Sequence, residues 1–317
     1  MSLPRQNSFE VRVPASTANL GAGFDCLGLA LELFLKVRAT VLSGPGAKSL
    51  ARSRGVAGSA LLPSSPEQNL ILRAMCRTAE KEGMHLPPVR LAVQNAIPVA
   101  GGLGSSAAAT VAGIALAYAV SGREIPRSNA LALAREIEGH ADNVAASLLG
   151  GLVVTLVRAD GTTVAVRKPW PKVIRIVVVT PLLALETKKS RAVLPKTVER
   201  ADAVHNLQRS ALLVAAIEER RYELLWDALQ DRLHQSYRQH LVPGLTEILA
   251  MPQVPGLLGV ALSGSGPSVV ALAIAEFQEI GKTISGYFER HGLKSTVRIL
   301  EAAQEGLNAS ENRSSRK

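Results

Sequence analysis

The most informative segment of this chain is Pro98-Val-Ala-Gly-Gly-Leu-Gly-Ser-Ser-Ala-Ala108. It follows an apolar, strand-like run over 89–93 and opens a run of small residues that is typical of a buried helix. Glycine adopts positive φ without steric cost, and the free N–H groups of a helix's first turn bind anions. Because Ser105 and Ser106 add two hydroxyls at the expected helix start, where serine is a good N-cap, the segment predicts a phosphate-binding loop.

Other phosphate-binding motifs fit this sequence less well. The Gly-Lys-Thr at 281–283 has Glu276 where a P-loop needs its first glycine. The sequence contains no Gly-x-Gly-x-x-Gly, so it lacks the dinucleotide-binding fingerprint. On local pattern alone, the remaining alternative is an ordinary glycine turn before a buried alanine helix.

Four segments together decide between these two interpretations. The loop resembles the Pro-x-x-x-Gly-Leu-Gly-Ser-Ser-Ala-Ala phosphate loop of the GHMP kinase superfamily. Three further segments resemble, in the family's order, the N-terminal, central and C-terminal motifs of homoserine kinases: Val13-Pro-Ala-Ser-Thr-Ala-Asn-Leu-Gly-Ala-Gly-Phe-Asp25, Glu138-Gly-His-Ala-Asp-Asn-Val-Ala145 and Leu262-Ser-Gly-Ser-Gly-Pro-Ser268. The resemblance therefore covers most of the chain.

Composition and charge narrow the class of protein. The 317 residues predict two domains, and 47% hydrophobic residues suffice for substantial cores. Apolar runs are too short to cross a membrane, the first ten residues show no signal-peptide pattern, and two cysteines make no disulfide framework, so we expect a cytoplasmic protein. The net charge of +10 favours anionic partners. Because only 3% of the residues are aromatic, few side chains could stack on the bases of a nucleic acid, and a polyphosphate substrate is the simpler explanation of the basic charge. A homodimer is left open.

The order of apolar runs predicts an α+β protein of two lobes. We expect strands at 9–13, 27–41, 89–95, 152–157, 164–168, 173–179, 260–262, 269–274 and 295–299, and helices at about 66–81, 105–120, 127–138, 201–220, 221–235, 245–250 and 275–291. Pro14 is expected to end the first strand, and 43–65 to form a long loop. The resemblance implies the two-lobed GHMP kinase fold: an N-terminal ATP-binding domain like ribosomal protein S5 domain 2 over 1–169 and a ferredoxin-like C-terminal domain over 170–305. The polar composition of the C-terminal residues predicts a frayed tail over 306–317.

The resemblance also implies ATP and Mg²⁺ in a cleft between the lobes. ATP would be bound by the glycine loop and by Asn69; the loop residues are Pro98, Val99, Ala100, Gly101, Gly102, Leu103, Gly104, Ser105, Ser106, Ala107 and Ala108. Magnesium prefers oxygen ligands, and we expect Glu136 and Ser106 to hold it, with Glu138 as the alternative. Glu136 and His140 share a face if helix 127–138 continues past Gly139.

On the acceptor side, the resemblance implies L-homoserine, phosphorylated to O-phospho-L-homoserine for threonine synthesis. Asn143 stands where mevalonate-type kinases carry Asp, so the expected catalytic set is Asn143, Ser106 and Glu136, without a protein base. The substrate carboxylate needs an arginine, whose guanidinium group can donate two parallel hydrogen bonds to it, and the substrate ammonium needs an anionic partner. The expected substrate-binding residues are Asn19, Asp25, His140, Asn143, Thr187, Arg191, Arg238, Ser263 and Gly264. The alternatives are another GHMP small-alcohol kinase, of the mevalonate or diphosphocytidyl-methylerythritol type, and a non-enzymatic RNA-binding protein with the S5-like fold.

Overall fold

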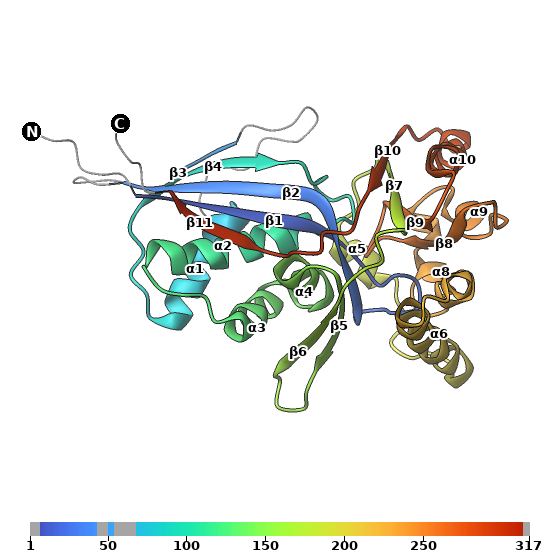
Figure 1. Cartoon of the computed structure of the whole chain (residues 1–317), viewed down its shortest axis with the longest axis horizontal. Helices are drawn as coiled ribbons and strands as arrows, with labels where there is room; N and C mark the ends of the chain where they lie inside the picture. The colour runs from blue at the N-terminus through green and yellow to red at the C-terminus, as the bar shows by residue number, and fades with distance from the viewer. Residues whose placement is uncertain (1–6, 43–49, 54–67, 313–317) are drawn as a thin grey trace, which may run out of the picture.

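Two β-sheets organise the chain, one in each half of the molecule (Figure 1). The computed structural model describes residues 7–42, 50–53 and 68–312. The first sheet has seven strands, with the order β11-β1-β2-β4-β3, β5 paired to β2 and β6 paired to β5. The second sheet has four strands in the order β10-β7-β9-β8.

The first lobe is a twisted sheet covered on one face by helices (Figure 1). Its strands are β1 (Ser8–Ala18), β2 (Leu27–Val41), β3 (Leu50–Ser53), β4 (Val89–Asn95), β5 (Leu152–Val157), β6 (Thr163–Lys168) and β11 (Asn308–Asn312). Its helices are α1 (Leu70–Glu82), α2 (Ser105–Val120), α3 (Arg127–Glu138) and α4 (Asp142–Leu149). Strand β4 alternates buried and exposed residues, as expected of a strand with one face on the core. Helix α2 is buried over most of its length because it packs against β1, α1 and α3.

The second lobe has the predicted ferredoxin-like arrangement of strands and helices. Its elements are β7 (Arg175–Pro181), α5 (Thr187–Ala192), α6 (Arg200–Glu218), η1 (Tyr222–Leu224), α7 (Leu225–Ala228), α8 (Gln235–Arg238), η2 (Gln239–Leu241), α9 (Leu245–Leu249), β8 (Leu257–Leu262), β9 (Val269–Ala273), α10 (Phe277–Arg290) and β10 (Ser295–Leu300). The helical segment between β7 and β8, the β8–β9 hairpin and the return through α10 to β10 give a β-α-β-β-α-β order. The predicted two-lobed α+β fold is therefore confirmed.

The hydrophobic core crosses from one lobe to the other. The larger cluster of buried side chains joins the first sheet and its helices to residues of the second half, including Trp170, Ile176, Leu213 and Leu272. A smaller cluster lies between the second sheet and α9 and α10, around Phe288. The lobes therefore share buried surface along the line where they meet.

Strand β1 continues past Pro14, and the prediction that this proline ends the strand is wrong. The pairing of β1 with β2 shifts register between Pro14 and Ala15, and β1 then runs on to Ala18. Proline lacks a backbone N–H and is tolerated in a sheet where a bulge interrupts the ladder. The extension carries the following turn, with Asn19 and Asp25, to the boundary between the lobes.

The C-terminal segment also differs from the prediction. Within the expected frayed tail 306–317, residues 308–312 form β11, which pairs antiparallel with β1 from Ser8↔Asn312 to Arg12↔Asn308. The polar composition of this strand hid it, because an edge strand needs backbone partners more than apolar side chains. The chain thus returns to the first sheet after β10. The division into domains near residue 169 stays a prediction.

Three smaller differences concern other elements. The expected second helix over 221–235 is instead η1, α7 and an irregular segment that ends at α8. Helix α4 was not predicted, and neither was β3, which falls within the expected loop 43–65. The rest of that loop lies outside the described residues, as does the expected start of the first helix at 66–67.

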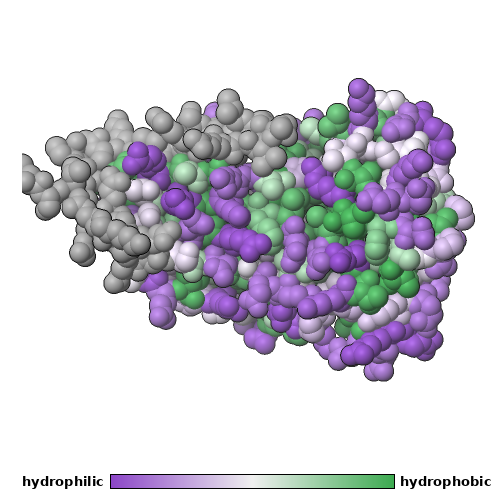
Figure 2. Space-filling model, turned by 45° about the horizontal axis from the view of Figure 1, so that its top comes forward, coloured by the Kyte–Doolittle hydropathy of each residue, from purple (hydrophilic) through white to green (hydrophobic). Residues whose placement is uncertain are grey.

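The surface is largely hydrophilic on the face seen in Figure 2, with hydrophobic side chains gathered mostly over the second lobe. Within the part of the chain that the structure describes, no helix is long and apolar enough to cross a membrane.

Candidate active site

The glycine loop joins β4 to α2 and lies at the boundary between the lobes. The backbone takes positive φ at Ala100 (53°), Gly102 (76°) and Gly104 (67°). A Cβ on Gly104 would meet the Ser16 hydroxyl oxygen at 2.1 Å, so the loop needs glycine there for space as well as for conformation.

The N-terminus of α2 opens into the cleft between the lobes. Gly104 is its N-cap, so Ser105 and Ser106 are the first helical residues and the expectation that serine caps the helix is wrong. The first helical hydrogen bond of the loop runs from Ala108 N–H to Gly104 O, 2.9 Å apart. The N–H groups that precede it have no partner within the helix and, with the helix dipole, favour an anion.

Glu138 lies in this cleft, whereas Glu136 does not. The Glu138 carboxylate accepts hydrogen bonds from the hydroxyls of Ser106 (2.9 Å) and Thr110 (2.6 Å). Glu136 forms an ion pair with Lys81 on the outer surface. Glu136, the expected metal ligand and catalytic residue, would share a face with His140 only if α3 continued past Gly139. Instead α3 ends at Glu138, with the next residue, Gly139, in the left-handed conformation (φ 86°).

The start of α4 holds three polar side chains together. His140 Nδ1 lies 2.8 Å from Asp142 Oδ1, which also accepts the backbone N–H of Asn143 at 2.7 Å. Burial lowers the pKa of His140, but the hydrogen bond and charge of Asp142 outweigh it and the net shift is upward. The hydroxyl of Ser16 donates to Asn143 Oδ1 at 2.9 Å, which leaves the amide nitrogen of Asn143 for the cleft.

Asp142 is a functional candidate that the sequence reasoning missed. It is only 2% exposed, and it lines the cleft between His140 and Asn143. The pattern that could have identified it was present, because it is a carboxylate inside the quoted central motif. Ser16, which lies inside the N-terminal motif, was missed in the same way.

Asp25 and Arg191 form a paired clamp at the other end of the cleft. Arg191 donates from Nη1 to Asp25 Oδ2 at 3.0 Å and from Nη2 to Asp25 Oδ1 at 2.5 Å. The hydrogen bonds that Arg191 donates to Asp25 raise the pKa of Arg191. Asn19 anchors this end of the turn, because its Oδ1 accepts the Asp25 N–H (3.1 Å) and its Nδ2 donates to Gly264 O (2.9 Å).

Arg238 is the most buried cation of the cleft, at 1% exposure. It donates to the carbonyl oxygens of Ser190 (3.2 Å) and Gly264 (3.1 Å). Burial, followed by repulsion from Arg191, lowers the pKa of Arg238 to about 10. The Phe24 ring lies near both cations, with the guanidinium carbons of Arg191 and Arg238 at 5.7 and 5.5 Å from its centroid.

The second glycine turn, between β8 and β9, contacts the first lobe directly. Gly264 N–H donates to Ala18 O at 3.1 Å, and the Ser263 hydroxyl donates to Gly102 O at 2.6 Å. A Cβ on Gly102 would meet Ser263 O at 2.6 Å, so the two glycine turns pack against each other. Thr187 lies beside this turn, with its hydroxyl 3.2 Å from that of Ser265.

The cleft brings together most of the predicted site residues. Those that line it are Asn19, Asp25, Pro98, Ala100, Gly101, Gly102, Gly104, Ser105, Ser106, Ala107, His140, Asn143, Thr187, Arg191, Arg238 and Gly264. Among the other lining residues are Glu138, Asp142, Phe24 and Ser265.

Some predicted residues do not line it. Leu103 and Ala108 are fully buried in the core, and Val99 is 54% exposed. Asn69 caps α1, because its Oδ1 accepts the N–H groups of Ile71 and Leu72, and its expected contact with nucleotide stays a prediction. Ser263 is fully buried and bonded between the lobes, which is a structural position.

A divalent metal beside the N-terminus of α2 would find the carboxylate of Glu138 there rather than a cage, because the other carboxylates that line the cleft, Asp25 and Asp142, bond to Arg191 and His140. Among residues 7–42, 50–53 and 68–312, no three His, Cys, Asp or Glu side chains are grouped to hold a metal ion. Glu138 with the Ser106 hydroxyl offers oxygen donors beside the helix N-terminus. Mg²⁺ suits such a site because it keeps several waters and binds through one or two carboxylates plus substrate phosphates.

Comparison with known proteins identifies relatives over nearly the whole chain. Family models match residues 69–151 (GHMP kinases N terminal domain) and 213–283 (GHMP kinases C terminal). The homoserine kinase of Desulfitobacterium hafniense is 40% identical over 297 residues, which is 93% of this chain and 98% of the relative. That of Solibacter usitatus is 42% identical over 302 residues, 94% and 96% of the two chains.

Solved structures agree with these relatives. The crystal structure of homoserine kinase from Cytophaga hutchinsonii superposes with a TM-score of 0.83 at 29% identity, covering 98% of this chain and 99% of that one. A mevalonate kinase structure superposes with a TM-score of 0.65 at 15% identity, covering 93% and 99%, which is a likeness of fold alone.

Proposed function

Because the chain belongs to the homoserine kinases of the GHMP kinase family, we propose that its cleft transfers the γ-phosphoryl group of ATP to the hydroxyl of L-homoserine. The product is O-phospho-L-homoserine, an intermediate of threonine synthesis. One observation carries the assignment of the site: the glycine loop and the Asp25, Arg191 and Arg238 group line the same cleft. The comparisons do not favour the mevalonate-type and RNA-binding alternatives.

The phosphate end of the cleft suits the triphosphate of ATP. Backbone N–H groups at the start of α2 donate to phosphate oxygens, and the helix dipole adds a positive potential. Phosphoryl transfer needs positioning and charge neutralisation more than covalent help from the protein. Glu138 and Ser106 would hold Mg²⁺, and the bound ion would neutralise the negative charge of the phosphate groups.

The acceptor end suits a zwitterionic amino acid. Arg191 and Arg238 offer guanidinium groups to the carboxylate, and Asp25 offers a carboxylate to the ammonium. In the free protein Asp25 and Arg191 pair with each other, so the substrate's two charges replace this ion pair with two new ones. The polar groups of Asn19 and His140 complete this end of the cleft.

Asn143 orients the acceptor hydroxyl without acting as a base. Its Oδ1 is occupied by Ser16, so the amide nitrogen donates a hydrogen bond to the reacting oxygen. An amide does not accept a full proton, so the hydroxyl is activated by orientation and by neutralisation of charge, and as its oxygen bonds to the γ-phosphorus and ADP leaves, its proton passes to an oxygen of the transferred phosphoryl group. Asp142 acts behind this group by holding His140 and the backbone of Asn143.

The proposal is tested by ADP release from Mg-ATP in a coupled assay with L-homoserine, D-homoserine, L-serine, mevalonate and galactose. We expect release with L-homoserine alone. Activity with another alcohol would be consistent with the phosphate site but would contradict the assignment of Arg191 and Arg238 to the carboxylate of the substrate. Silence with every alcohol, together with salt-dependent RNA binding, would favour the binding-protein alternative.

A further inference from the structure

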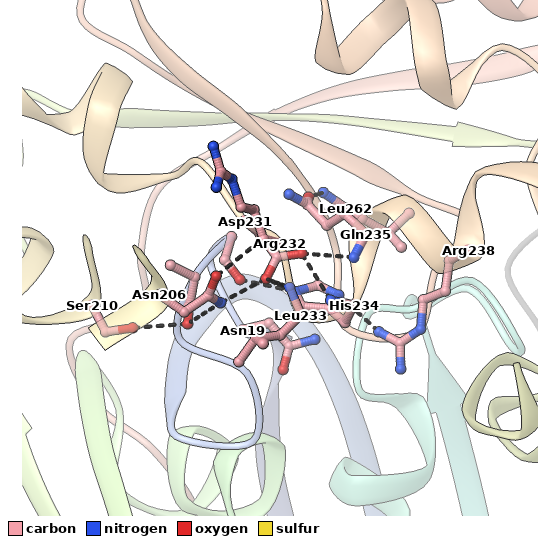
Figure 3. A network of polar contacts seen from close by, with 12 residues as sticks. Asn19, Asn206, Ser210, Asp231, Arg232, Leu233, His234, Gln235, Arg238 and Leu262 are labelled. Carbon is pink, nitrogen blue, oxygen red and sulfur yellow. Dashed lines mark hydrogen bonds and ion pairs between the residues drawn. The ribbon is translucent and has the colours of Figure 1, made fainter. Parts of the chain in front are cut away.

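A buried polar network joins residues 231–238 to the turn between β1 and β2 (Figure 3). His234 stands at its centre and has no exposed surface. Its Nδ1 lies 3.0 Å from Nη1 of Arg238, and its Nε2 lies 2.8 Å from the carbonyl oxygen of Gly21. One imidazole therefore links a cation of the cleft to the turn that carries Asp25.

The partners of His234 determine its tautomer. A guanidinium only donates hydrogen bonds, so the Nδ1 of His234 is an acceptor and carries no proton. Its Nε2 then carries the ring proton and donates it to Gly21 O. The neutral imidazole therefore satisfies both ring nitrogens. Burial also favours this neutral form, because it lowers the pKa of His234.

All the hydrogen-bond acceptors of Arg238 are uncharged. They are the carbonyl oxygens of Ser190 and Gly264 and the imidazole of His234. Within the described part of the chain, no carboxylate forms an ion pair with Arg238, and no hydrogen bond reaches its Nη2. The guanidinium is thus fixed in orientation with no carboxylate bonded to it, although the charges of Asp25, Asp231 and Asp142 attract it from a greater distance. One of its nitrogens is left for the cleft that it lines.

The ring of His234 is itself held rigidly. The buried carboxylate of Asp231 accepts the backbone N–H groups of His234 (3.0 Å) and Gln235 (2.7 Å) and the side-chain amide of Asn206 (2.7 Å). The Phe24 ring stacks on the imidazole, with centroids 5.1 Å apart and planes at 25°. Figure 3 shows how these bonds converge on the segment before α8.

We propose that His234 is a positioning residue whose Nδ1 lone pair aims the Arg238 guanidinium at the substrate carboxylate while leaving its charge free. The inference rests on the proposed function, because it takes Arg238 as a ligand of that carboxylate. A carboxylate at position 234 would also accept from Arg238, but it would neutralise the charge that the substrate needs. A neutral imidazole orients the arginine without competing for it.

Two substitutions separate the two hydrogen bonds of the ring. In His234→Asn the amide oxygen takes the place of Nδ1 and still accepts from Arg238, whereas in His234→Gln the amide nitrogen takes the place of Nε2 and still donates to Gly21. We measure KM for L-homoserine, KM for ATP and kcat in both variants. We expect His234→Gln to raise the homoserine KM roughly 10- to 100-fold, the size of a lost hydrogen bond to a charged group. In His234→Asn we expect the homoserine KM to rise by less than about threefold. In both variants we expect the KM for ATP to stay within about twofold of the wild-type value.

Equal increases in homoserine KM for the two variants, or parallel increases for ATP and homoserine, would show a merely structural role and overturn the inference. The tautomer is tested without any variant, by the ¹⁵N shifts of His234 in the wild-type protein. A proton on Nε2 alone is expected, and a proton on Nδ1 would overturn the inference whether or not the variants fold. Failure of the proposed function is distinguishable, because the wild type would then show no homoserine-dependent ADP release.

Discussion

At the residue scale, the choice between two glutamates shows how local spacing can mislead. Glu136 and Glu138 are two positions apart on α3, yet one pairs with Lys81 outside and the other bonds Ser106 inside the cleft. Both residues lie within α3, and two positions along an α-helix correspond to a rotation of about 200°, so their side chains point to opposite faces of the helix. The face of Glu138 is the one that meets Ser106 and Thr110 of α2.

The first prediction tests this assignment with a matched pair of variants. Glu138→Gln is expected to lower kcat by about 100-fold or more, as when a charge-stabilising group at a reacting centre is removed. Glu136→Gln serves as the control and should leave kcat within about twofold, since surface ion pairs contribute little. Steady-state kinetics over a range of Mg²⁺ concentrations measure both. The reverse pattern would restore Glu136 as the metal ligand.

The second prediction concerns Asn143. Asn143→Ala is expected to lower kcat roughly 10- to 100-fold, because a hydrogen bond to a reacting oxygen that develops charge is lost. ATP binding should persist, because the backbone donors of α2 are untouched. Equilibrium binding of ATP and single-turnover rates separate the two effects. Wild-type turnover in this variant would remove Asn143 from the mechanism.

At the scale of elements, the junction of the glycine loop with α2 couples conformation to packing. Gly104 combines a positive φ with a close approach to Ser16, so any Cβ is excluded on both counts. Not every glycine of the chain is constrained in this way. Gly286 in α10 has open space where a Cβ would stand, and its backbone is not in the left-handed region.

The third prediction compares alanine at these two positions. Gly104→Ala is expected to destabilise the protein by roughly 2–4 kcal/mol, from left-handed strain and a steric clash, and to weaken ATP binding. Gly286→Ala should instead stabilise it by about 0.5–1 kcal/mol, because alanine favours a helix interior. Urea unfolding and ATP titration measure both variants. A neutral Gly104→Ala would mean that the loop relaxes easily and is not preorganised.

The fourth prediction concerns β11. Removing residues 308–317 is expected to cost roughly 2 kcal/mol or more of unfolding free energy, because β1 loses its pairing partner over 8–12. Removing only 313–317 leaves that pairing intact and is the control. Thermal melts and hydrogen exchange of the β1 amides provide the comparison. Equal stability of the two truncated proteins would show that the β11 pairing contributes nothing in solution.

At the scale of the whole molecule, the two lobes are joined by more than the connecting chain. The larger core cluster includes side chains from both lobes, and the two glycine turns bond directly through Ser263 and Gly102. The site lies on this junction, so its geometry depends on both lobes being folded and docked.

The fifth prediction follows from this shared core. Unfolding should occur in one calorimetric transition, with equal calorimetric and van't Hoff enthalpies, since neither lobe keeps its buried surface without the other. The fragment 1–169, which lacks both β11 and the contacts from the second lobe, should not unfold cooperatively. Two resolved transitions in the intact chain, or a stably folded fragment, would show that the lobes are independent.

Much of the secondary structure could be predicted from the sequence because local residue patterns indicate it. Alternating apolar residues marked β4, the run of small residues marked α2, and the glycine-rich loop marked the phosphate site between them. The four motifs identified the family, and with it the two lobes and most of the residues that line the cleft. The strands and helices needed only side-chain periodicity and local spacing, whereas the domain folds and the residues of the cleft were implied by the resemblance to the family.

The tertiary structure alone decided which side chains meet. It placed Glu138 rather than Glu136 beside Ser106, paired Asp25 with Arg191 across 166 positions of sequence, and brought β11 back to β1. It also set His234 between Gly21 and Arg238, a contact that no local pattern announces. The physical reason is that hydrogen bonds and ion pairs act over a few ångströms in space, whereas sequence periodicity reports only which face of its own element a residue occupies.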